Sequence, residues 1–451
     1  MFRDDLMKVL KKDLISAHMP GHKYKRIHGG NLLKMDTTEI EGTDNLHHPT
    51  GIIKKAMDHA RDAYGSDATH FLVGGSTVGI LAAIMGSTKR GEQILVGRDC
   101  HQSVYHACML KGLTYETVGP IWSSSGTIEG YEEQAILDCL AKNESIKVVV
   151  ITSPSYYGYT TDLGSVVELM DKREGIVIVD EAHGAHLNFS SKSRVSALNM
   201  GAHIVVQSTH KTLPAMTQTG VIHFKNAHRC YSGVTEYLKI LQSSSPSYVL
   251  IASIDEAIHY MVDNRQRQDN LFGHIVELKA TRLKRWLSGV KEQDDPFKIW
   301  LHTAPVGYTG YEINQLLISH GIYCELSNHS GVLLYLSIMN TEAELEAIAD
   351  VLDGVVMKTP LAPIRVMYPA PIRLYDKDQL DRLCEEVVNL DDAAGKVAAQ
   401  RIVPYPPGIP LIMPGELITE EHVTIIRGLM GDHHEIIGME MERENIRVVS
   451  R

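Results

Sequence analysis

The sequence contains few cysteines and few large aromatic residues, and it has no long apolar run. Its 451 residues include 6 Cys, 3 Trp and 6 Phe. The cysteines are scattered, with no C-x-x-C pair and no zinc-ligand spacing, which argues against a disulfide framework and favours reduced thiols. No segment approaches the roughly 18 apolar residues of a membrane span, and no N-terminal run resembles a signal peptide. We therefore expect a cytoplasmic protein without a membrane partner.

Acidic residues outnumber basic ones, so the chain has no excess of positive charge. Lys and Arg total 44 and Asp and Glu total 55, which gives a formal net charge of -11 at pH 7. This balance argues against a nucleic-acid partner and suits a cationic small molecule as substrate. The 23 histidines are dispersed and form no H-E-x-x-H pattern, so we expect no metal site.

Near-continuous apolar runs alternate with helical patterns along the first half of the chain. They occur at 94–96, 147–152, 175–179 and 203–206. Strands that are apolar on both faces are typical of a mostly parallel sheet covered by helices. We therefore predict an α/β fold with a large domain over 1–235, including an N-terminal arm. A smaller α+β domain is expected over 236–360, beginning with a long helix at about 248–287, and a C-terminal domain over 361–451.

Polar side chains gather where the predicted strands end. They lie at or just beyond a carboxyl end, or at the start of the next helix: Ser76, His101, Ser153, Asp180, Ser208, His210 and Lys211. Ligands of open α/β sheets bind beyond this edge. No single residue carries the inference, but their convergence predicts one binding site.

Lys211 comes shortly after the strand at 203–206, where an ammonium group is costly to bury. A lone lysine in such a place is usually a solvated loop residue. Here it is accompanied by Asp180, at the end of a second buried strand, and by the turn G-G-S-T at 74–77. Together these residues predict a lysine that forms a Schiff base with pyridoxal 5′-phosphate, PLP.

The phosphate of PLP has candidate ligands at two strand ends. Glycines before a helix allow close approach of the backbone, and the free amides of the first helical turn suit an anion. The side chains of Ser76, Thr77, Ser208 and His210 could complete the phosphate site. Ser and Thr also cap helices for structural reasons, so a plain N-cap is the alternative.

The ring of PLP also has candidate partners. Asp180 can keep the pyridine nitrogen protonated, because an ion pair near 4 Å contributes on the order of 4 kcal/mol. His101 is expected either to cap the helix that follows it or to stack on the ring. Ala182 is small enough to pack closely on the opposite face, and His183 follows it in the chain.

An acidic stretch at 36–51 has two interpretations. It contains Asp36, Glu39, Glu41 and Asp44. These carboxylates either cap the next helix or form a loop that recognises a cation, and the residues alone favour the first. Further along, five prolines in 401–416 exclude a helix and favour an extended, rigid passage.

The chain resembles the PLP-dependent ornithine/lysine/arginine decarboxylases of fold type I, in the short form of Gram-positive bacteria. The matching segments span nearly the whole chain: HMPGHK at 18, DNLHHPTGII at 44, FLVGGSTVG at 71, RDCHQS at 98, SPSYYG at 153, VDEAHGAH at 179, QSTHKTL at 207, SSSPSY at 243 and YPPGIPLIMPGE at 405. The resemblance implies an aspartate aminotransferase-like fold. The proline-rich motif is the most specific of these segments, because other enzymes of fold type I lack it.

The resemblance also implies roles for residues already singled out. Lys211 matches the Schiff-base lysine, Asp180 the pyridine partner and His101 the stacking histidine. The phosphate contacts match Ser76, Ser208 and His210. The serines before Pro246, Ser244 among them, fall where such enzymes reach the phosphate of a neighbouring subunit, which implies a homodimer or a higher oligomer.

The implied reaction is α-decarboxylation of a basic amino acid to CO2 and an amine of polyamine biosynthesis. Arginine is favoured over lysine and ornithine by analogy with the short form of the family. The catalytic residues would be Lys211, His210, His101 and Asp180, and candidate ligands of the cationic side chain are Glu39, Glu41, Asp44 and Glu416. Another fold-type-I enzyme, such as an aminotransferase that uses Arg365 or Arg373 as a carboxylate clamp, or a lyase, is the nearest alternative. A catalytically silent regulatory relative is a further one.

Overall fold

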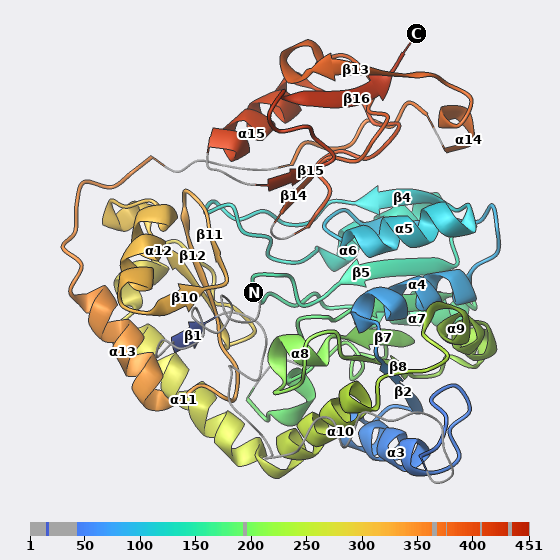
Figure 1. Ribbon diagram of the computed structural model, residues 1–451, viewed down its shortest axis with the longest axis horizontal. Coiled ribbons are helices and arrows are strands. Elements are labelled where there is room, and N and C mark those ends of the chain that lie inside the picture. Colours follow the sequence, from blue (N-terminus) through green and yellow to red (C-terminus); the bar gives the residue numbers. More distant parts are fainter. Residues whose placement is uncertain are drawn as a thin grey trace, which may run out of the picture.

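The computed structural model describes residues 15–17, 43–192, 196–362, 368–375, 377–405, 408–431 and 435–450. Figure 1 shows three units: a large one around the central sheet, a smaller one beside it, and a C-terminal unit, in red, above both. The predicted HMPGHK turn, the acidic residues before position 43 and Arg365 lie outside the described residues.

A seven-stranded sheet forms the large unit, in the order β2-β8-β7-β6-β5-β3-β4. Its strands are β2 Ala68–Leu72, β3 Gln93–Gly97, β4 Thr114–Val118, β5 Val148–Thr152, β6 Ile176–Asp180, β7 Ile204–Gln207 and β8 Gly220–Phe224. Within this sheet β8 runs in the direction opposite to the other six strands, which all run the same way. The predicted mostly parallel α/β fold is therefore confirmed.

Alternate residues of the strands pack into two separate apolar cores, one on each face of the sheet. In β5, Val148 and Val150 belong to one apolar cluster, and Val149 and Ile151 belong to the other. The first cluster takes in α4 Gly75–Ser87, α5 Gln102–Lys111 and α9 His228–Leu241. The second takes in α3 Ile52–Tyr64, α6 Glu133–Lys142, α7 Gly164–Lys172 and α10 Tyr248–Asp263. Burial on both faces explains why these strands lack the polar alternation of a half-exposed sheet.

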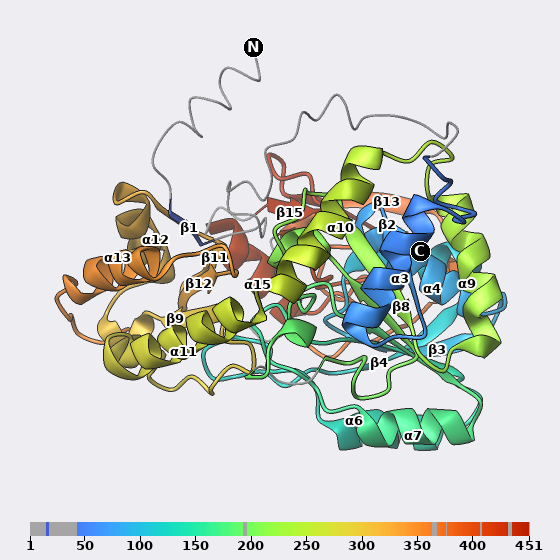
Figure 2. The ribbon, with the colours of Figure 1, turned by 90° about the horizontal axis from the view of Figure 1, so that it is seen from below.

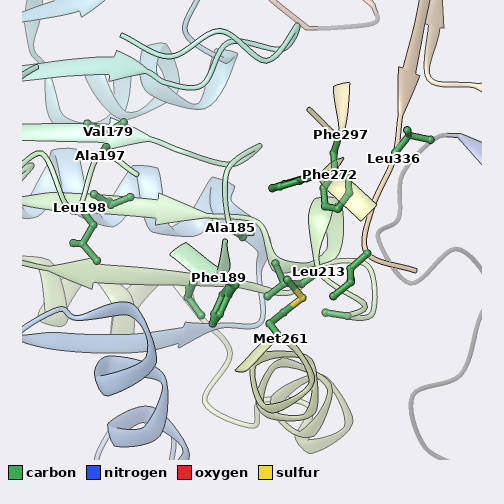
Figure 3. Packing of buried hydrophobic residues seen from close by; sticks show 14 of the residues in the cluster. Val179, Ala185, Phe189, Ala197, Leu198, Leu213, Met261, Phe272, Phe297 and Leu336 are labelled. Carbon is green, nitrogen blue, oxygen red and sulfur yellow. The ribbon is translucent and has the colours of Figure 1, made fainter. Parts of the chain in front are cut away.

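The second core continues from the sheet into the smaller unit. Figure 3 shows it running from Val179 past Leu213 and Met261 to Phe272 and Phe297. The last two rings pack edge to face, with centroids 4.4 Å apart. The large unit and the smaller unit therefore share one apolar core.

The prediction of one continuous helix at about 248–287 is wrong. It is broken into α10 and α11 Arg265–Thr281, followed by a short 3-10 turn at Lys284–Leu287. The break falls at Asn264, whose side-chain amide donates to the carbonyl of Tyr260 at 2.8 Å. An Asn side chain that bonds local backbone competes with the helix ladder and favours a helix end.

The smaller unit is built on an antiparallel sheet of β9 Lys298–His302, β12 Gly331–Tyr335 and β11 Leu326–Ser327. Next to it, β10 Ile322–Cys324 pairs with β1 Ile15–Ala17. Two helices, α12 Gly310–Ser319 and α13 Glu342–Asp353, each begin at a capping box with a Thr N-cap and a Glu three residues later. The predicted α+β character of this region is confirmed, whereas the domain limits stay a prediction; the one at 235/236 falls inside α9.

The C-terminal unit has a small core of its own. It contains the ladders β13 Glu385–Asn389 with β16 Asn445–Val449 and β14 Val403–Tyr405 with β15 Glu435–Ile437, and the helix α15 Glu420–Gly431. The proline-rich passage at 401–416 includes β14, and its residues Leu411 and Glu416 bond Arg98 of the large unit. Within the described ranges, none of the helices has the length and apolar character needed to cross a membrane.

Candidate active site

One cavity lies at the carboxyl ends of the central strands, with a volume of about 490 Å³. Of the predicted cofactor residues, all but Ser244 line it. Its lining consists of Gly75, Ser76, Thr77, Asp99, His101, Thr152, Tyr156, Asp180, Ala182, His183, Ser208, His210, Lys211, Glu325, Tyr405 and Ile409. The strand-end residues expected to converge all line this cavity except Ser153, whose buried hydroxyl instead accepts a hydrogen bond from the amide of Thr161 at 3.1 Å.

Lys211 lies on α8 Thr209–Thr212, a single turn that follows β7. Its Nζ atom is 3.0 Å from Nε2 of His183, and Nδ1 of that histidine is 2.9 Å from the hydroxyl of Tyr335. Burial lowers the pKa of Lys211, although Asp180 and Glu325 act in the opposite direction. A lowered pKa raises the fraction of neutral amine, which is the form that attacks a carbonyl group.

Asp180 is the last residue of β6 and is buried at the base of the cavity. Its carboxylate accepts a hydrogen bond from the amide of Ala182 at 3.1 Å. Burial raises the pKa of Asp180, and the positive charge of Lys211 opposes this rise. A buried carboxylate of this kind has a strong preference for a cationic partner such as a protonated ring nitrogen.

The start of α4 offers a candidate anion site. Its N-cap residue is Gly74 and no side chain caps the first amides, although the amide of Gly75 donates to the carbonyl of Gln218 at 2.8 Å. Gly75 has a φ of 73°, a left-handed conformation that favours glycine. The hydroxyls of Ser208 and Ser76 are 2.8 Å apart at the same place. Uncapped amides and hydroxyls at the start of a thirteen-residue helix suit a phosphate group.

The capping interpretation of His101 is confirmed, and its stacking on the ring of PLP stays a prediction. Its Nδ1 accepts from the amide of Ser103 at 3.3 Å, which caps α5, and its ring also lines the cavity. Burial, and then the charge of Lys211, lowers the pKa of His101 to about 4. The residue therefore presents a neutral, flat ring at neutral pH. His210, also in the lining, has its Nδ1 2.8 Å from the carbonyl of Thr219, which fixes its ring.

Several lining residues were not predicted. Glu325 lies between β10 and β11 of the smaller unit, and it accepts a hydrogen bond from the hydroxyl of Tyr156 at 2.5 Å. Tyr405 and Ile409 come from the proline-rich passage of the C-terminal unit. The cavity is therefore walled by all three units, and only the part formed by strand ends has a local sequence signal.

Asp99 is a further carboxylate of the cavity that the sequence did not single out. It accepts a hydrogen bond from the hydroxyl of Tyr131, which contributes to its fixed position. Burial raises the pKa of Asp99 to about 7, against the opposing effect of that hydrogen bond. At neutral pH this group is therefore substantially protonated.

Asp44, a predicted substrate ligand, does not reach the cavity in this chain. Its carboxylate accepts from the amides of Thr50, Gly51, Ile53 and Lys54 at the start of α3. Partial burial raises its pKa, but these backbone donors and that of Asn45 lower it to about 2. The capping interpretation of the acidic stretch is therefore correct for this residue, because helix amides satisfy it fully.

Glu416 is also absent from the cavity lining. It forms a buried ion pair with Arg98, at 2.8 Å, with 2% and 5% of the two side chains exposed. Arg373 is exposed and stacks on the ring of Tyr115, so it does not serve as a clamp inside the cavity. Ser244 is exposed and outside the cavity of its own chain.

The chain is similar to proteins of one family over most of its length. Residues 11–304 match the major domain of the Orn/Lys/Arg decarboxylases, and residues 371–436 match their C-terminal domain. The chain is 36% identical to the uncharacterized Bacillus subtilis protein YaaO over 93% of its own length and 92% of that protein. It is 30% identical to the arginine decarboxylase of Halalkalibacterium halodurans, over 92% of this chain and 90% of that one.

Among solved structures, the lysine decarboxylase LdcF of Francisella novicida superposes with a TM-score of 0.77 at 19% identity. The match covers 94% of this chain and 76% of that one. At this identity the likeness establishes the fold, which is that of the PLP-dependent enzymes of fold type I. From the two domain matches, the chain belongs to the Orn/Lys/Arg decarboxylase family.

Proposed function

We propose that this protein is a PLP-dependent decarboxylase of a basic amino acid, with arginine as the preferred substrate. The observation that carries the proposal is the partly buried amine of Lys211, which shares one cavity with the carboxylate of Asp180 and the start of α4, where no side chain caps the helix. The relatives named arginine decarboxylase are 28–30% identical to this chain, against 22–23% for the lysine decarboxylases. This difference supports arginine.

The residues of the cavity fit PLP. The uncapped amides of α4 would hold its phosphate, together with the hydroxyls of Ser76 and Ser208, and Lys211 would bind its aldehyde carbon. Asp180 would hold a proton at the ring nitrogen, and the neutral ring of His101 would lie against one face. When bound, PLP supplies an electron-withdrawing system for the bond that breaks at the substrate Cα.

The protein's own groups favour loss of the carboxylate. None of the arginines in the described ranges of this chain lines the cavity, so none of them is placed to clamp the substrate carboxylate. A weakly held carboxylate departs more easily than a clamped one. A proton then has to be delivered to Cα, and the Nζ of Lys211 or the ring of His210 is placed in the lining to deliver it.

Glu325 would bind the positive end of the substrate side chain. The carboxyl groups of the lining are those of Asp99, Asp180 and Glu325. Asp180 is assigned to the ring nitrogen, and Asp99 is bonded to Tyr131 with a pKa of about 7. Glu325 enters from the smaller unit and is held by the hydroxyl of Tyr156. It therefore takes the place of Asp44 and Glu416 among the candidate head-group ligands.

The exposed position of Ser244 fits a role in a second subunit. The segment from Ser243 to Ser245 is exposed and precedes α10. We propose that it contacts the phosphate site of a neighbouring subunit, so that the active form is at least a homodimer.

The reaction is tested by offering arginine, lysine and ornithine separately to the purified protein with added PLP. The expected result is release of one CO2 per matching amine from one of the three, without any keto-acid co-substrate. Amino-group transfer to a keto acid in place of CO2 release would contradict the proposal and favour an aminotransferase. Absence of both reactions, in protein that fails to bind PLP, would favour a silent relative.

A further inference from the structure

Three metal-ligand side chains meet between α3 and α10, outside the cavity. They are His59 on α3, and Asp255 and His259 on α10. One ligand atom of each lies within 4.8 Å of the others. Figures 1 and 2 both show α3 alongside α10, so the meeting does not depend on one viewing direction. The residues are far apart in sequence, and no local pattern points to them.

The α10 pair has the spacing of a helical chelate. Asp255 and His259 are four residues apart, which places both side chains on the same face of the helix. Nδ1 of His259 is 3.3 Å from Oδ1 of Asp255. The rings of His59 and His259 are stacked, with centroids 3.7 Å apart and an angle of 13°. His59 therefore lies beside the Asp255 and His259 pair because α3 packs against α10.

Two polar atoms of this cluster lack hydrogen-bond partners. Nδ1 of His59 and Oδ1 of Asp255 are both buried and have no hydrogen bond within the described part of the chain. Nδ1 of His259 lies 3.3 Å from that oxygen, but its hydrogen bond is to the backbone carbonyl of Asp255, at 3.0 Å. Buried polar atoms are satisfied in the great majority of native structures, and each exception calls for an explanation such as an ion. Both atoms are of the types that bind transition metals.

The charge around the cluster suits a cation. The carboxylates of Asp255, Asp62 and Asp263 all act electrostatically on His59, so negative charge lies close to the cluster.

We propose that His59, Asp255 and His259 bind a divalent transition metal of the Zn²⁺ or Co²⁺ class, which links α3 to α10. Two imidazoles and a carboxylate suit such ions better than Mg²⁺ or Ca²⁺, which prefer oxygen ligands. With bonds of about 2.0–2.2 Å, ligand atoms of a tetrahedral site are roughly 3.4 Å apart. His259 is 52% exposed at its side chain, so its ring can turn to close this gap without moving the backbone.

The metal would act on stability rather than on the reaction. None of its ligands lines the cavity of the candidate active site. An ion that binds the folded chain and bridges two helices shifts the folding equilibrium toward the folded state. The site is therefore independent of the proposed function, and either could fail without the other.

The test uses untagged, PLP-loaded protein, treated with a chelator and dialysed free of excess PLP. Co²⁺ alone is titrated, and its visible ligand-field absorption and the bound metal are measured. The expected result is saturation at one Co²⁺ per chain, displacement by Zn²⁺, and a rise in Tm on metal addition. His259→Ala, a change at a half-exposed position, should weaken binding at least about tenfold and abolish the rise in Tm.

The matched control is His320→Ala, because His320 is an exposed histidine at the end of α12. This variant should bind Co²⁺ like the unchanged protein. His59→Gln should repeat the loss seen with His259→Ala. Absence of saturable Co²⁺ binding, or binding that survives both ligand substitutions, would overturn the proposal and leave the two imidazoles as a packing contact.

Discussion

The guanidinium of Arg98 and the carboxylate of Glu416 form a buried ion pair, 2.8 Å long, between the large unit and the C-terminal unit. Arg98 also donates to the carbonyl of Leu411 at 3.0 Å, and Glu416 accepts from the amide of Met413 at 2.8 Å. Arg98 directly precedes Asp99, which lines the cavity. The pair therefore fastens the proline-rich passage beside the cavity that this passage helps to wall.

Replacing Arg98 by Met should lower the free energy of unfolding by about 3–5 kcal/mol, because a buried carboxylate loses its partner. The control is Arg427→Met, which breaks the more exposed pairs with Asp391 and Glu444 and should have a much smaller effect. Urea denaturation measures both. Equal effects of the two substitutions would show that the Arg98 pair has no special role in holding the C-terminal unit.

Asp180→Asn should reduce kcat about 10³-fold, the equivalent of an ion pair on the order of 4 kcal/mol. The amide keeps the size of the side chain but cannot hold the ring nitrogen in its protonated form. Asp99→Asn is the matched control, since burial raises the pKa of Asp99 to about 7 and the group is already partly neutral at pH 7. Its kcat should change much less. A similar loss in both variants would argue against the assignment of Asp180.

Glu325→Gln should raise the KM for the basic amino acid by tenfold or more, because a hydrogen bond to a charged group contributes about 1.5–3 kcal/mol. The effect on kcat should be smaller, since the side-chain end is remote from Cα. Tyr156→Phe removes the hydrogen bond that holds Glu325 and should raise KM by a smaller factor. An unchanged KM in steady-state assays of Glu325→Gln would exclude it as the head-group ligand.

Asp44→Ala should destabilise the protein by about 0.5–2 kcal/mol at neutral pH, as loss of an N-cap does. The pKa of Asp44 falls from 3.8 to about 2 in the folded chain. Its stabilisation is therefore fully present above pH 3.8 and is lost as pH falls toward 2. The difference in Tm between the two proteins should be constant at higher pH and should narrow as the pH falls from 3.8 toward 2. A difference independent of pH would show that the charge of Asp44 does not act on α3.

The strand-end part of the site was predictable, and its other walls were not. Asp180, Ser208 and Lys211 follow apolar runs, and parallel strands bring such residues to one edge of the sheet. Glu325 follows a three-residue strand of another unit, and its place in the cavity depends on how the units pack. Tyr405 belongs to the proline-rich family motif, which was a signal for the family but not for the cavity.

Glu416 and Asn264 show two further limits of local patterns. A carboxylate at the end of a family motif is compatible with a substrate ligand and with an ion pair, and only the position of Arg98 decides between them. The helical pattern across 248–287 is compatible with one helix or two, and the side chain of Asn264 decides this through its bond to Tyr260. The role of Glu416 thus depends on a residue far away in the sequence, and the helix break depends on the geometry of one side chain.

The proposed role of Lys211 is that of the amine that binds PLP. To test this role, the protein is incubated with PLP and reduced with borohydride, and the pyridoxyl group is located by peptide mass spectrometry. We expect stoichiometric labelling of Lys211, and no stoichiometric label in the Lys211→Ala variant. Labelling of another lysine, such as the buried Lys298, with Lys211 unmodified, would contradict it.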